Sequence, residues 1–244
     1  MAAKRLALLS GLIVLSFLLS SVAYARPASI PANDIERGVF VNPVPRAKGG
    51  GGGGEATESN TSYSYKGLHW PFNVVHYEVD TAQVPASLNS ADVVSAVDAS
   101  FYSWQAQYNI LGRPDQSDIW YVNDGEAAST GPVLDGSNTV GFAGLSSGTL
   151  AATYYWYDRR SKNLIEFDIV FNTLYPWSTS GESGKYDVFN IGTHEAGHTL
   201  QLGDLYRGAT SELTMYGYGA AGETKKQSLG LGDMLGLEKI YPTP

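Results

Sequence analysis

The sequence of 244 residues contains no cysteine, which excludes disulfide bonds, thiolate metal sites, iron–sulfur clusters and cysteine nucleophiles. Basic residues are also few: 16 Lys and Arg stand against 24 Asp and Glu, for a formal net charge of −8. This acidic balance argues against sequence-independent nucleic-acid binding, which needs a basic surface. Histidine is scarce, with four in all, so few combinations could build a metal site. The chain does have 43% hydrophobic and 12% aromatic residues, enough to bury the core of one domain.

Only one long hydrophobic run occurs, and it lies at the N-terminus. Residues 6–22 are apolar or small, and they follow Lys4 and Arg5. Residues 23–25, Ala-Tyr-Ala, then match the small-x-small pattern of a signal-peptidase site. Residues 1–25 are therefore predicted to be a signal peptide, and the protein to be secreted or extracellular, freely or at a cell surface. The alternative is an uncleaved membrane anchor, although the run is near the lower length limit for a span.

Residues 26–66 are predicted to be a pro-segment and flexible linker. They contain four prolines and six consecutive glycines, Gly49 to Gly54, whose ordering would cost much entropy. Residues 1–66 hold seven Lys or Arg and four Asp or Glu, a net of +3, and the rest of the chain has a net of −11. All five tryptophans also follow residue 66. The folded domain is therefore placed at residues 67–244.

Strands and helices are predicted to alternate through this domain. Residues 90–108 carry apolar side chains at helical spacing from Val94 to Tyr108, after a cap at Asn89 or Ser90. The other predicted elements are strands near 75–79, 119–122, 149–157 and 164–171, and helices over about 188–202, capped by Asp187, and 232–241. The strands near 149–157 and 164–171 are predicted to form a hairpin. The fold class is α/β (α+β), a mixed sheet with helices packed on it.

The strongest motif is His194-Glu195-Ala-Gly-His198, the H-E-x-x-H pattern. Residues four apart on a helix share one face, so both imidazoles could bind one zinc ion. Glu195 could then act on a water molecule at the metal. The alternative is a pair of ordinary histidines on an amphipathic helix.

After this motif the sequence resembles the metzincin superfamily, in particular its matrixin-like members. That family places a third zinc ligand six residues after the second, where this chain has Asp204, as in the snapalysin type. A carboxylate in a His₂-carboxylate set is chemically sound. The family's glycine after the second ligand is replaced by Gln201, and Gly203 could supply the turn instead. His69 and His76 are the only other imidazoles.

Two more segments carry the resemblance. Met215, followed by Tyr216, resembles the family's Met-turn, and Asp233 resembles the aspartate of the C-terminal helix that supports this turn. The resemblance spans about residues 68–241 and implies a metzincin-like catalytic domain. Such a domain has a twisted mixed sheet, an antiparallel edge strand, an active-site helix and a C-terminal helix.

The implied activity is that of a zinc-dependent endopeptidase acting on protein or peptide substrates. Zinc would polarise the scissile carbonyl and lower the pKa of its bound water, with Glu195 as general base. Substrate would pair with the strand that contains Leu150 and Ala151, and Tyr216 and Tyr218 would line the pocket beyond the scissile bond.

The resemblance also bears on a structural calcium site and on how the pro-segment could keep the enzyme inactive. Structural Ca²⁺ is a weaker expectation, and its candidate ligands are Asp124, Glu126, Asp135 and Asp168. Without cysteine, the thiolate that silences animal matrixins is excluded, so a pro-segment carboxylate such as Asp34 or Glu36 could hold the fourth zinc position.

Two other functions stay open. One is a catalytically idle zinc-binding surface or interaction module, and the other is an H-E-x-x-H hydrolase of a gluzincin-type lineage with a distant glutamate ligand. No nucleic-acid partner is expected, membrane contact only through an uncleaved signal segment, and the protein is expected to be a monomer.

Overall fold

The computed structural model describes residues 30–44, 57–128 and 131–244. The predicted signal peptide and the glycine run Gly49–Gly54 lie outside these residues. Within them, no helix is both long and apolar enough to cross a membrane.

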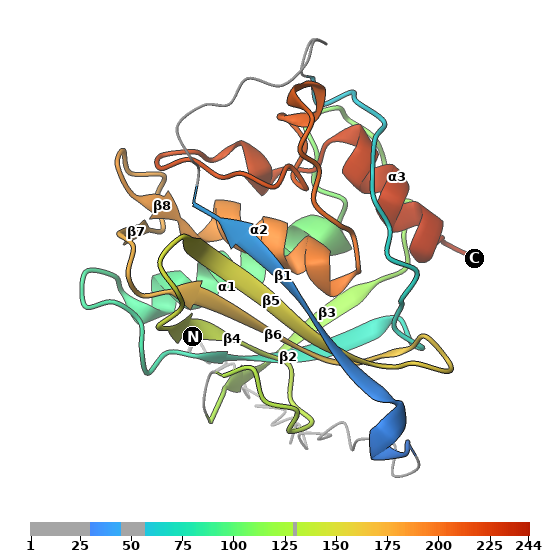
Figure 1. The fold of residues 1–244 in the computed structure, drawn as a ribbon. Helices are drawn as coiled ribbons and strands as arrows, with labels where there is room; N and C mark the ends of the chain where they lie inside the picture. Colours follow the sequence, from blue (N-terminus) through green and yellow to red (C-terminus); the bar gives the residue numbers. More distant parts are fainter. Residues whose placement is uncertain (1–29, 45–56, 129–130) are drawn as a thin grey trace, which may run out of the picture.

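The fold is a mixed α/β arrangement built on a six-stranded sheet (Figure 1). Its strands are β1 (Ile35–Pro43), β2 (Val74–Asp80), β3 (Trp120–Glu126), β4 (Thr139–Ala143), β5 (Thr149–Asp158) and β6 (Leu164–Asn172). Their order is β1-β5-β6-β4-β2-β3. Strands β6, β4, β2 and β3 pair in parallel, and β5 is antiparallel to both of its neighbours. The predicted mixed sheet and the β5–β6 hairpin are thus confirmed.

In the described part of the chain three α-helices accompany the sheet: α1 (Ser90–Gln105), α2 (Val188–Thr199) and α3 (Leu231–Ile240). Asn89 caps α1 by accepting from the N–H groups of Ala91 and Asp92, and Asp187 caps α2 by accepting from that of Asn190. Both caps match the sequence pattern. A short pair, β7 (Trp177–Ser178) and β8 (Tyr186–Asp187), leads into α2.

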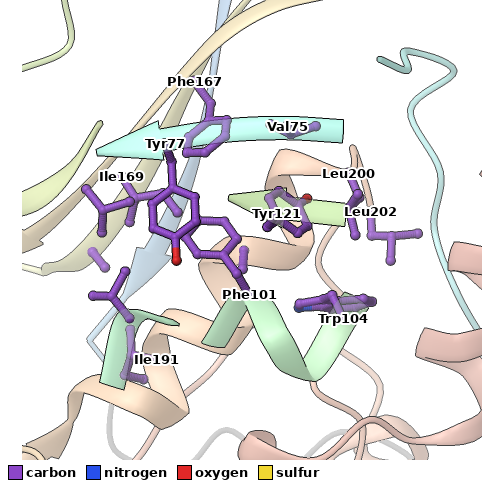
Figure 2. Packing of buried hydrophobic residues seen from close by; sticks show 14 of the residues in the cluster. Val75, Tyr77, Phe101, Trp104, Tyr121, Phe167, Ile169, Ile191, Leu200 and Leu202 are labelled. Atoms are coloured by element: carbon purple, nitrogen blue, oxygen red, sulfur yellow. The ribbon is translucent and has the colours of Figure 1, made fainter. Parts of the chain in front are cut away.

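The hydrophobic core lies between the sheet and helices α1 and α2. Figure 2 shows Phe101 of α1 beside Tyr77 of β2, and Trp104 of α1 on the side of Leu200 and Leu202. The ring centroids of Tyr77 and Phe101 are 4.2 Å apart. Burial of this aromatic cluster fixes α1 and α2 on one face of the sheet, with α2 against β5 and β6.

Two details of the prediction need correction. Helix α1 ends at Gln105, and Tyr108 lies beyond it with 54% of its surface exposed, so it is not part of the buried face. Strand β4 was not predicted, because its short sequence Thr-Val-Gly-Phe-Ala lies in a segment rich in glycine and serine.

A larger correction concerns residues 26–66. The flexible-linker prediction fails in the two parts that the structure describes. Residues 35–43 form strand β1, which pairs with β5 from Ile35↔Asp158 to Pro43↔Thr149. Residues 57–66 also join the fold, since the backbone of Lys66 donates to Gln201 and the carbonyl of Ser64 accepts from Gly203. Consequently β5 is not the edge strand of the sheet; β1 is (Figure 1).

Candidate metal centre and active site

Helix α2 brings His194, Glu195 and His198 together at its buried face. All three side chains have no exposed surface, and their possible ligand atoms lie within 4.8 Å of one another. Among the described residues this is the only such group of metal-ligating side chains. The helical spacing of one turn explains why the two imidazoles meet, with ring centroids 4.7 Å apart.

The two imidazoles are oriented by backbone carbonyls. Nδ1 of His194 lies 2.8 Å from the carbonyl oxygen of Thr214, and Nδ1 of His198 lies 2.7 Å from that of Leu202. A carbonyl can only accept, so each Nδ1 carries a proton, and in the neutral ring Nε2 keeps its lone pair. Neither Nε2 has a hydrogen-bond partner, although both are buried. This is the tautomer and the orientation that a metal-binding imidazole requires.

Asp204 completes the group from the loop after α2. Its Oδ1 lies 3.1 Å from Nε2 of His194 and 3.6 Å from Nε2 of His198, and it too is buried without a hydrogen bond. Burial raises the pKa of this carboxyl, but the two imidazoles outweigh burial and hold the pKa well below its usual value. Burial, followed by the charge of Lys226, lowers the pKa of His194 to about 4. Asp204 is thus ionised while His194 is neutral near pH 7.

The turn between His198 and Asp204 is made by Gln201. This residue has φ 65°, in the left-handed region, whereas Gly203 does not. The chain therefore turns at the position where the metzincin pattern has glycine. Because this chain has Gln201 there, the left-handed backbone conformation costs about 1–2 kcal/mol. Backbone bonds hold it there, since the carbonyl of Gln201 accepts from Lys66 and the N–H of Gly203 donates to Ser64.

Glu195 is held from the neighbouring strand. Oγ1 of Thr153 on β5 donates to Oε2 of Glu195 at 2.6 Å, while Oε1 is buried with no hydrogen-bond partner. Burial raises the pKa of the Glu195 carboxyl. One oxygen is thus anchored, and the other is free to accept a proton.

The segment around Met215 packs against helix α2 and supports the two histidines. Sδ of Met215 lies so near α2 that a Cβ on Gly197 would come within 2.3 Å of it. The carboxylate of Asp233 accepts from the N–H groups of Thr214 and Met215 at 2.8 and 3.1 Å. Because the carbonyl of Thr214 orients His194, Asp233 acts on the site through this turn. Burial raises the pKa of Asp233 to about 6.

A buried cation also borders the site. Lys226 has no exposed surface, and its Nζ donates to the carbonyl of Tyr216. Burial lowers its pKa to about 8, and the charges of Glu223, Asp204 and Glu195 partly offset this. Lys226 thus places positive charge near two carboxylates of the site.

The four residues expected to contact substrate lie in two different environments. Leu150 and Ala151 are fully buried, and Ala151 is paired with Asn42 of β1. Tyr216 and Tyr218 lie in the loop after Met215 with ring centroids 5.7 Å apart, and Tyr218 is 39% exposed. The predicted substrate strand is therefore already occupied by a segment of the same chain.

Among the described residues, the four candidate calcium ligands form no group whose ligand atoms lie within 4.8 Å of one another, although the charge of Asp135 acts on both Glu166 and Asp168. Asp124 pairs with His76, and Glu126 accepts from Thr81. Asp168 is buried and accepts from Thr139. The N–H of Asp135 donates to a different carboxylate, that of Glu166.

The two carboxylates considered for latency are also held away from the site. Asp34 lies near Arg159 and Arg160, and Glu36 accepts from Tyr157. The structure therefore does not support either as a fourth ligand.

Several side chains at the site were not found from the sequence. Thr153, Lys226, Phe40 and Asn42 lie far from α2 in the chain and belong to no motif. The pairing of β1 with β5 and the packing of the segment before α3, which contains Lys226, bring them near the histidines.

No protein-family model matches the sequence, and no curated protein sequence matches it.

Proposed function

We propose that the protein is a secreted, zinc-dependent endopeptidase with a matrixin-like metzincin catalytic domain. The observation that carries the proposal is the convergence of three buried, unpartnered ligand atoms: Nε2 of His194, Nε2 of His198 and Oδ1 of Asp204. Tetrahedral zinc bonds of ~2.0–2.2 Å imply ligand atoms about 3.3 Å apart. The observed separations of Asp204 from the two histidines, 3.1 and 3.6 Å, bracket that value. The donor set therefore fits zinc.

A zinc ion bound by these three residues would supply a Lewis acid that polarises a peptide carbonyl and acidifies a water molecule. Glu195 receives the proton of the water at Oε1, the oxygen left without a partner, and delivers it to the leaving amine. Thr153 holds Oε2 and so fixes the direction of Oε1. Thr214 and Leu202 keep the two Nε2 atoms aimed inward.

The presence of Glu195 beside the two histidines supports hydrolysis rather than mere zinc storage. Two carboxylates, Asp204 and Glu195, would neutralise a zinc ion, and Lys226 adds positive charge nearby. An idle zinc module has no need of Glu195, a buried carboxyl whose burial raises its pKa. A gluzincin-type site has no need of Asp204.

Two substitutions separate these possibilities. Glu195→Gln should leave zinc binding intact and lower the hydrolysis of a fluorogenic peptide library by orders of magnitude, because the proton acceptor is gone. Asp204→Ala should weaken zinc binding by at least tenfold. Glu182→Gln, a surface carboxylate beside Lys185, is the matched control and should change neither.

The assay is run on the chain that starts at Arg26, both intact and after β1 has been released by a site-specific cut between residues 45 and 56. Zinc content is measured in the same samples. Full zinc affinity and activity in Asp204→Ala would refute the metzincin assignment. Unchanged hydrolysis in Glu195→Gln would refute the assigned chemistry.

A further inference from the structure

Strand β1 presents alternate side chains to the candidate active site. In an antiparallel pair, directly opposite residues point to the same face. Gly38, Phe40 and Asn42 are opposite Tyr155, Thr153 and Ala151. Because Thr153 reaches Glu195, the residues opposite it and two positions away face the same side.

Phe40 lies directly on a proposed zinc ligand. Its ring stacks on the imidazole of His198, with centroids 4.1 Å apart and planes inclined by 1°. Only 8% of its surface is exposed. Its neighbours in the chain, Val39 and Val41, point the other way and are 47% and 41% exposed. The strand therefore packs its large aromatic side chain, Phe40, against the site and leaves the apolar side chains of Val39 and Val41 exposed to solvent.

Asn42 brings an amide group to the same place. Its side chain is fully buried, and neither its Nδ2 nor its Oδ1 has a hydrogen-bond partner. The amide lies beside the carboxylate of Glu195. A buried carboxamide without partners costs free energy unless a polar group is there to receive it. Chemically it resembles the peptide amide that the proposed activity would attack.

Gly38 lets the strand lie close to β5. A Cβ at this position would come within 2.1 Å of Cζ of Tyr155, so any side chain would push that ring away. The Tyr155 ring also contacts Phe40, with centroids 5.2 Å apart. Gly38 and Tyr155 thus help to set the position of Phe40.

The start of the strand is held by polar contacts outside the site. Asp34 pairs with Arg160 at 3.0 Å, and the guanidinium of Arg37 lies 4.7 Å from the ring centroid of Tyr154. These contacts fix the register at one end, while Phe40 and Asn42 fill the site at the other.

We propose that residues 35–43 are an intramolecular occupant of the peptide site expected along β5. The preferred ligand has a small residue, an aromatic residue and a carboxamide at alternate positions, as Gly38, Phe40 and Asn42 have. Another peptide gains access only when β1 leaves. The occupancy rests on the proposed function, because β1 covers the same site.

The test replaces the glycine run Gly49–Gly54 by a recognition sequence for a site-specific protease. After cutting, the N-terminal fragment is removed, and a fluorescent synthetic peptide of residues 31–44 is titrated into the remaining chain. Saturable 1:1 binding is expected. Peptides with Phe40→Ala or Asn42→Leu should bind at least tenfold more weakly, and the matched control Val41→Ala should bind within about threefold of the parent.

Hydrogen exchange provides a readout that needs neither catalysis nor cutting. In the uncut chain, the amides of β5 that bond to β1 should exchange faster after Phe40→Ala than after Val41→Ala. Absence of saturable binding, or equal effects of Phe40→Ala and Val41→Ala, would overturn the proposal.

The proposed peptidase activity is tested separately, by measuring peptide hydrolysis. With zinc added, the cut and stripped chain should hydrolyse peptides, and the peptide of residues 31–44 should inhibit it competitively. If the stripped chain rebinds this peptide with the same discrimination but hydrolyses nothing, the occupancy of the site is supported and the peptidase proposal fails.

Discussion

The hydrogen bond from Thr153 to Glu195 allows a quantitative prediction. Thr153→Val keeps the shape of this fully buried side chain but removes the hydroxyl that donates to Oε2 at 2.6 Å. A hydrogen bond to a charged group contributes about 1.5–3 kcal/mol. Since one pKa unit corresponds to about 1.36 kcal/mol, the pKa of Glu195 should rise by about one to two units.

The sign of the effect on catalysis follows from the role of Glu195 as a base. The carboxylate must be ionised to accept a proton, so kcat/KM rises with pH through its pKa. In Thr153→Val this acidic limb should therefore move upward by about one to two pH units, and the rate below the limb should fall by about 10- to 100-fold.

The assay is a pH profile of kcat/KM on a fluorogenic peptide, with zinc content measured in parallel. Thr193→Val is the control, because it removes a buried threonine hydroxyl from α2 that bonds to the carbonyl of Phe189 and not to Glu195. An acidic limb that is unchanged in Thr153→Val, at equal zinc content, would refute the assignment of Glu195 and its anchor.

Three other predictions concern stability. Gly197→Ala should destabilise the fold by about 1–3 kcal/mol in urea unfolding, because its Cβ would meet Met215; a neutral result would contradict the close packing beneath the histidines. Asp233→Ala should cost about 2–5 kcal/mol, because it leaves buried backbone N–H donors without an acceptor, and zinc affinity should fall with it. Burial raises the pKa of Glu166 to about 7, so the native state holds its proton more tightly than the unfolded chain and stability falls as pH rises from about 4.5 to 7. Burial also raises the pKa of Asp168 to about 7, so Glu166→Gln should reduce this slope without abolishing it in melting curves recorded between pH 4 and 8, and an unchanged slope would show that Glu166 does not contribute to it.

The parts of the structure that could be predicted are those with local causes. The cap at Asp187 and the spacing of His194 and His198 specify a helix and one of its faces within a dozen residues. The β5–β6 hairpin is also local, since a short turn joins two strands of strong β propensity. Local patterns of this kind need no knowledge of the distant chain.

The rest depends on contacts between distant segments. In β1 the buried side chains are Phe40 and Asn42, while Val39 and Val41 are exposed, so hydrophobic alternation gives the wrong face. Its partner β5 lies more than a hundred residues away. Only the folded sheet shows that a segment typical of a linker occupies the site.

Gln201 shows the limit of reading a motif by residue type. The missing glycine leaves the position of the turn open between Gln201 and Gly203. The backbone bonds of Lys66 and Ser64 to this loop, from a segment predicted to be a linker, hold Gln201 in the left-handed conformation. Tertiary contacts thus offset a local preference.

We propose that His194, His198 and Asp204 hold a zinc ion that Glu195 uses to cleave peptides. The most direct test is a peptide-library digest with the chain from Arg26, freed of β1 by the engineered cut and stripping, before and after treatment with a zinc chelator. We predict cleavage that the chelator abolishes and that one equivalent of zinc restores, with no restoration in Glu195→Gln. Cleavage that survives complete removal of zinc, or no cleavage by the zinc-loaded chain, would contradict the account.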